Sequence, residues 1–279
     1  YHGKIGNDFS YNIAGNISTY KNKVLSLGGG TNIPGKTHLG NQVNTMIEPG
    51  KPIGYFYGYK MDGVFQTQEE INNYRGGPDN TIIMPTAEPG DLKFVDLNGD
   101  GKLGEEDRTM IGNPHPDFTF GLTLSGEYKG FDLSMFFQGS VGNDILNILK
   151  YDIYSGTGWY NAPKDIFDKF WTGPGSTNEN FAISANSRDN LTMSEWYIEN
   201  GSYVRLKNVT LGYTFPKQWV QKLTVQNLRL FVAAQNLFTI TSYSGLDPEL
   251  GNSNPAFMGI DMGWYPQARS FMVGLSLKL

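Results

Sequence analysis

The sequence contains no cysteine among its 279 residues. This absence excludes disulfides, thiolate catalysis and zinc sites with cysteine ligands. Charged residues make up only 18% of the chain, below the roughly 25% usual for soluble domains, and no basic run accompanies the net charge of -5. We therefore expect no nucleic-acid partner.

Long apolar runs are absent too, since no stretch approaches the roughly 18 residues of a transmembrane helix. The three histidines, His2, His38 and His115, are isolated, and neither H-E-x-x-H nor G-x-S-x-G occurs. We therefore expect no catalytic residue and no enzymatic activity. The chain opens on Tyr1 without a signal peptide, so we expect it to be a piece of a longer precursor.

Glycine and aromatic residues are abundant instead, with 35 glycines and 14% aromatics. Many aromatics with few lysines and glutamates favour strands and turns over helices. Apolar and polar residues alternate in six runs, longer than the roughly 5 or 6 residues of an ordinary strand. The runs lie within residues 9–18, 117–129, 131–141, 208–215, 228–235 and 271–279. Lys129-Gly130 joins the second and third runs as a tight hairpin turn.

Two architectures put one apolar and one polar face on such strands. A β-sandwich buries the apolar face, whereas a transmembrane barrel turns it to lipid and lines its interior with the polar face. The polar faces here carry mostly Ser, Thr, Asn, Gly and Gln, with charges near strand ends, which favours an antiparallel barrel. The residues expected to face lipid include Phe120, Leu122, Leu133, Met135, Leu211, Tyr213 and Val273.

Connection lengths point the same way. Short links join the second run to the third and the fourth to the fifth, while long links cover about 21–115, 143–201 and 242–267. Short periplasmic turns and long extracellular loops alternate in this manner in outer-membrane barrels. Six strands cannot close such a barrel, so we expect the chain to form part of one barrel domain over 1–279, with further strands supplied from upstream.

The stretch "DLNGDGKLGEED" (96–107) has the spacing of a calcium-binding EF-hand loop. Asp96, Asn98, Asp100 and Asp107 would offer side-chain oxygens, and Lys102 its backbone carbonyl, to a structural calcium ion. No helix pair flanks the loop, which argues against a calcium sensor. The alternative is turn chemistry without a metal, because Asp, Asn and Gly also favour turns.

Several segments resemble the SusC/RagA family of TonB-dependent outer-membrane transporters. They are "EPGKPIGYFYGYKMDGVFQTQEEI" (48–71), "PGDLKFVDLNGDGKLGEEDRTMIGNPHPDFTFG" (89–121), "SYVRLKNVTLGYTFP" (202–216), "NLRLFVAAQNLFTIT" (227–241) and "YPQARSFMVGLSLKL" (265–279). The resemblance implies an all-β fold, the C-terminal portion of a 22-stranded barrel that surrounds a plug. One departure is Leu279, because outer-membrane barrels commonly end in an aromatic residue.

The resemblance also implies a function and a location. It places the protein in the outer membrane of a Gram-negative bacterium, surrounded by lipid, importing nutrient oligomers (glycans or peptides). A SusD-like surface lipoprotein would cap the barrel, and TonB would act through the N-terminal part. The alternative function is a secreted, calcium-stabilised β-sandwich that binds carbohydrate or acts as an adhesin. The aromatic residues of the long loops could contact a sugar or the capping lipoprotein, or they could fasten the loops to one another. They are Trp159, Tyr160, Trp171, Trp196, Tyr197, Trp264 and Tyr265.

Overall fold

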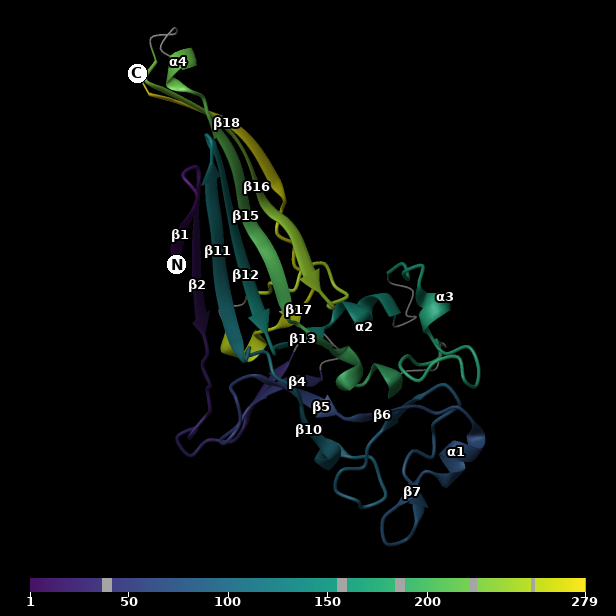
Figure 1. The fold of residues 1–279 in the computed structure, drawn as a ribbon. Coiled ribbons are helices and arrows are strands. Elements are labelled where there is room, and N and C mark those ends of the chain that lie inside the picture. The colour runs from purple at the N-terminus through teal and green to yellow at the C-terminus, as the bar shows by residue number, and fades with distance from the viewer. Residues whose placement is uncertain (37–41, 155–159, 184–188, 221–224, 252–253, 279) are drawn as a thin grey trace.

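A long, curved antiparallel sheet of seven strands organises the molecule (Figure 1). The computed structural model describes residues 1–278 apart from 37–41, 155–159, 184–188, 221–224 and 252–253. In spatial order the strands are β1 (His2–Ile5), β2 (Phe9–Ser18), β11 (Phe118–Tyr128), β12 (Phe131–Val141), β15 (Tyr203–Thr214), β16 (Asn227–Thr241) and β18 (Ser270–Lys278). The six predicted strands are confirmed, and β1 is an additional one.

Pairing across the sheet places the apolar residues in rows on one face, which we call the apolar face. Leu124, for example, stands between Ile13 of β2 and Met135 of β12. All seven residues expected to face lipid lie on it. Ile17 is 70% exposed and Leu211 45% exposed. A β-sandwich would bury these side chains in its core, so the sandwich alternative does not describe this structure.

A bulge in β15 and β16 keeps the apolar face continuous. The register of β15 against both neighbours shifts between Leu206 and Asn208, and Asn236 in β16 has a positive φ of 50°. Leu206 pairs with Phe137 while Val209 pairs with Met135, so Leu206 and Val209 share the apolar face despite their odd spacing. The extra residue thereby turns Arg205 to the opposite, polar face.

The two ends of the sheet differ strongly (Figure 1). At the turn end lie the Lys129-Gly130 hairpin, helix α4 (Lys217–Val220) and the end of β18. At the loop end, the long connections fold into a compact loop layer. The layer also holds α1 (Gln68–Asn73), α2 (Leu149–Tyr154) and α3 (Ile166–Lys169). Among the described residues, no helix combines the length and the apolar character that a membrane span requires.

The loop layer contains small sheets that the sequence did not predict. One has the order β10 (Arg108–Gly112), β5 (Tyr55–Tyr59), β4 (Val43–Ile47), β3 (Ile33–Lys36), and another the order β14 (Ile198–Asn200), β13 (Asp144–Asn147), β17 (Ile260–Asp261). Two further sheets have two strands each. One pairs β6 (Met61–Val64) with β9 (Leu92–Phe94), and the other pairs β7 (Arg75–Gly76) with β8 (Thr81–Ile82). The buried core of the described residues lies almost wholly in this layer and includes Phe56, Phe65, Leu92, Leu146 and Trp196.

Candidate functional site in the loop layer

The predicted metal loop runs from the end of β9 to the short 3-10 helix η1 (Glu105–Asp107). Both carboxylate oxygens of Asp96 accept backbone N–H groups, Oδ1 from Gly99 at 2.7 Å and Oδ2 from Gly101 at 2.8 Å. Gly99 and Gly101 have positive φ angles of 74° and 86°, which glycine adopts without strain. The first predicted ligand therefore organises the turn from its own side chain.

Asp107, the twelfth residue of the loop, is fully buried. Its Oδ1 accepts N–H groups from Leu97 at 2.8 Å and Asn98 at 3.2 Å, and its Oδ2 accepts the Gly104 N–H at 2.7 Å. Three backbone N–H groups thus donate to this carboxylate. Asp107 therefore closes the loop onto its own beginning.

The remaining predicted ligands bond within the same turn. Asp100 Oδ1 accepts the Lys102 N–H at 2.9 Å, and Asn98 donates its amide to Asp100 Oδ2 at 3.3 Å. The donor set consists of hard oxygens, which suits calcium. Across the described residues, however, no three acidic or histidine side chains converge on one ion-sized point. The local geometry is that of hydrogen-bonded turns, and calcium binding stays a prediction.

The loop docks on the β7–β8 hairpin. Thr81 donates its hydroxyl to the Gly101 carbonyl at 2.9 Å. A side chain on Gly77 would collide with the Asp100 backbone, so glycine permits this close approach. The loop thus fastens a distal hairpin to the rest of the loop layer, with or without a metal.

Three of the six described loop aromatics fasten the loops to one another. Trp196 and Tyr197 are buried in the core of the loop layer, and the Trp196 ring lies 4.9 Å from that of Phe181. Trp171 donates its indole N–H to Gln66 at 3.1 Å. Tyr160, Trp264 and Tyr265 are exposed, whereas Trp159 lies outside the described residues. The exposed three remain available to a ligand or partner.

Two adjoining hollows of about 460 and 490 Å³ share Lys150, Glu179, Asn180 and Trp196 in their walls. The Lys150 ammonium lies 3.0 Å from the Glu199 carboxylate and 5.1 Å from the centre of the Trp196 ring. Burial tends to raise the pKa of Glu199, but the Lys150 charge and hydrogen bonds from Ser244 outweigh it and lower that pKa. The two hollows form a cleft that presents charged and aromatic groups together.

A buried ion-pair network ties the loop 242–269 to the sheet. Arg205 on β15 bonds to Asp247 and to Glu249, the latter at 2.6 Å, and Lys207 reaches Glu249 at 2.8 Å. Arg205 is only 2% exposed. Sequence reasoning missed this network because about forty residues separate the partners and no local motif marks them.

Comparison with known proteins places these features in a family. The chain is 37% identical over 97% of its length to TonB-dependent receptor P3 of Formosa agariphila. It is 28% identical over 97% of its length to TonB-dependent receptor SusC of Bacteroides thetaiotaomicron. It spans 27% and 24% of those two receptors, about a quarter of each. No family model matches.

Solved structures agree on the fold. The RagAB peptide importer in its closed-closed state superposes over 99% of this chain with a TM-score of 0.71 and 20% identity. The open-open state gives a TM-score of 0.69 over the whole chain, which again matches about a quarter of the longer protein. The seven-stranded sheet is therefore a section of a transmembrane β-barrel wall, and the chain belongs to the SusC/RagA family of TonB-dependent outer-membrane receptors.

Proposed function

We propose that the whole protein imports nutrient oligomers across the outer membrane with energy transmitted by TonB. This chain would supply seven strands of the barrel wall and the loop layer at one end. The observation that carries the proposal is the continuous apolar face of the sheet, exposed as a lipid-facing surface must be, in a chain related to TonB-dependent receptors. Energy would come from the inner membrane, so no catalytic group is needed here.

We further propose that the loop layer faces outward and meets a SusD-like lipoprotein and the substrate. The cleft around Lys150 and Trp196 supports this, because it mixes an aromatic wall with charges of both signs. Phe167 on α3 and Tyr160 nearby in sequence are 84% and 64% exposed, as contact residues of a partner would be in its absence.

Glycans and peptides both remain candidate substrates. SusC is the name of one relative, and the similar RagAB structures are described as peptide importers or transporters. Aromatic rings stack on sugars, and paired charges of both signs suit the termini and side chains of peptides. The cleft offers both chemistries.

We also propose that the 96–107 loop takes up calcium as a structural ion. The support is chemical: Asp96, Asn98, Asp100 and Asp107 bring hard oxygens at EF-hand spacing. Both oxygens of Asp96 and the Oδ2 of Asp107 accept one backbone N–H each and so retain a lone pair for an ion, whereas Asp107 Oδ1 already accepts two. The ion would stiffen the attachment of the β7–β8 hairpin.

Deletion of the encoding gene tests the import proposal. The mutant is grown on a panel of oligosaccharides and peptides as sole nutrient, beside a strain that lacks TonB. We expect both strains to lose growth on the same oligomer while growth on its monomers is normal. Normal growth of the deletion mutant on every oligomer would contradict import, as would turnover of an oligomer by the purified protein.

A further inference from the structure

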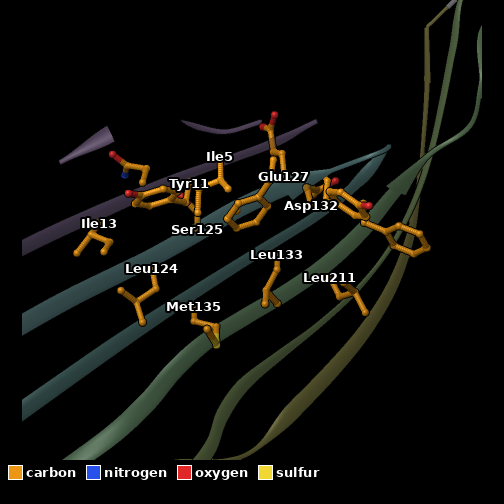
Figure 2. Close-up of a pocket in the computed structure, with 15 residues that line it drawn as sticks. Ile5, Tyr11, Ile13, Leu124, Ser125, Glu127, Asp132, Leu133, Met135 and Leu211 are labelled. Atoms are coloured by element: carbon orange, nitrogen blue, oxygen red, sulfur yellow. The ribbon is translucent and has the colours of Figure 1, made fainter. Parts of the chain in front are cut away.

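A hollow of about 480 Å³ opens on the apolar face near the turn end. Figure 2 shows its wall, in which Ile13, Leu124, Met135 and Leu211 stand on four neighbouring strands. We call this hollow the groove. It is separate from the cleft in the loop layer and lies on the surface that faces lipid.

The groove exists because one row of the apolar face lacks a side chain. Gly126 stands between Tyr11 and Leu133, which project on either side of it. The Phe9 ring leans over this position, since a Cβ on Gly126 would lie 3.3 Å from that ring. The apolar face therefore has a depression at Gly126, and the side chains around this depression are apolar.

Aromatic rings surround the turn end of the groove. Phe9 lies 5.9 Å from Tyr11 and 6.5 Å from Tyr128, and Phe131 lies 4.6 Å from Tyr213. Belts of aromatic side chains mark the membrane–water interface in outer-membrane barrels. The groove thus begins at headgroup level and runs toward the middle of the bilayer.

Charges of both signs stand beside this entrance. A second hollow shares Phe9, Glu127, Tyr128, Phe131 and Asp132 with the groove. Its other charged lining residues are Lys4, Asp8, Lys129 and Arg229. The Lys129 ammonium lies 3.4 Å from the Asp8 carboxylate, and both side chains are more than half exposed. Lys129 occupies a turn position with φ of 47°, where asparagine or glycine is favoured, so its side chain is an unusual choice for the turn alone.

We propose that the groove holds one acyl chain of a phospholipid with a zwitterionic, amine-bearing headgroup. The Lys129 ammonium binds the phosphate, and the Asp8 carboxylate binds the headgroup amine. An exposed ion pair is weak, so its two members exchange readily for the two charges of the headgroup. The groove is continuous with the lipid-facing surface, which supplies the occupant directly. This inference rests on the barrel fold and is independent of what the protein imports.

Native mass spectrometry of the intact transporter tests the proposal, with phosphatidylethanolamine and phosphatidylglycerol added in turn. We expect one phosphatidylethanolamine to remain bound at activation energies that remove other lipids. Met135→Trp fills the groove and weakens retention by about tenfold or more. Val232→Trp is the matched control, because Val232 lies in the same row as Gly126 but outside the groove. Leu124→Phe is a milder second variant.

A second pair of variants tests the contact between Lys129 and the lipid headgroup. Lys129→Gln removes the preference for phosphatidylethanolamine over phosphatidylglycerol, whereas Lys278→Gln at the same end of the sheet leaves it unchanged. Equal lipid retention in wild type, Met135→Trp and Leu124→Phe would overturn the proposal. So would a change of oligomeric state in these variants without loss of lipid, because the groove would then hold a second copy of the protein.

Discussion

Arg229 on β16 reaches across β15 to bind Asp132 on β12. Its Nε lies 2.9 Å from Asp132 Oδ1, and a second guanidinium nitrogen bonds Oδ2, so the pair is bidentate. Gly212 on β15 lies directly beneath, where a Cβ would come 2.4 Å from the guanidinium. Three strands are thereby joined on the polar face by a contact that only glycine at position 212 allows.

We expect Gly212→Val to separate Arg229 from Asp132 and to destabilise the barrel. The cost should be about 1–3 kcal/mol, as for other insertions into filled space. Thr210→Val, two residues away on the same face, is the control and should cost less than about 1 kcal/mol. Urea-dependent refolding into vesicles measures both. Equal stability of the two variants would contradict this account of the glycine.

Arginine scanning distinguishes the two faces of β11. Leu122→Arg places a charge in the bilayer and should cost about 2–4 kcal/mol, whereas Thr123→Arg on the polar face should cost about 0–1 kcal/mol. Refolding into vesicles again provides the free energies. Similar tolerance at these adjacent positions would argue against a lipid-facing Leu122.

Asp247→Asn should detach the loop 242–269 from the sheet. The substitution removes one of the two carboxylates that pair with the buried Arg205 and leaves Glu249 as its remaining partner. The cost should therefore lie below the about 3–5 kcal/mol of breaking a comparable buried pair completely. Hydrogen exchange of the loop amides should rise sharply. Glu105→Gln is the control, because Glu105 pairs with Arg108 while 77% exposed and should contribute less than about 1 kcal/mol. Unchanged protection in Asp247→Asn would show that the network does not hold the loop.

Acidification should release the same loop. Burial tends to raise the pKa of Asp247, but hydrogen bonds from the Gln267 N–H and Arg205 outweigh it, so the folded pKa lies below the ordinary 3.8. Stability from this group is therefore fully present above pH 3.8 and is lost as pH falls through the lower, folded value. Loop hydrogen exchange, corrected for the intrinsic rate, should increase only in that acidic range. Release at neutral pH would contradict the assignment.

Calcium should bind the 96–107 loop weakly, with a dissociation constant of about 10⁻⁴–10⁻³ M. Titration calorimetry of the purified protein measures the affinity. Asp100→Asn removes a ligand charge while keeping an oxygen acceptor for the Lys102 N–H, so binding should weaken without loss of the turn. Asp79→Asn outside the loop is the control. Absence of a calcium-dependent signal at millimolar concentration would leave the hydrogen-bonded turn as the whole role of the loop.

Alternation within single strands was enough to find six strands of the sheet. A strand with one face in lipid and one in water must repeat every two residues, and β11 and β12 display that repeat along most of their length. Strand β1 escaped because its four residues, His2–Ile5, are too few for a pattern. The small sheets of the loop layer escaped for the same reason, since their short strands are held by packing from distant segments.

The acidic loop shows where local information ends. Its turns follow from Asp, Asn and Gly at fixed spacing, so the sequence located them. The bonds of Asp107 to backbone N–H groups depend on how the loop closes, which spacing does not specify.

The sequence by itself determined the family, the strand pattern and the face that meets lipid, because each depends on residues close together in the chain. Only the tertiary structure decided the partners of Arg205, the ion pair above Gly212 and the groove beside Gly126. Those features need strand register and a bulge to bring remote residues together. Register depends on the pairing of whole strands, and a single residue of slip would turn each side chain to the other face.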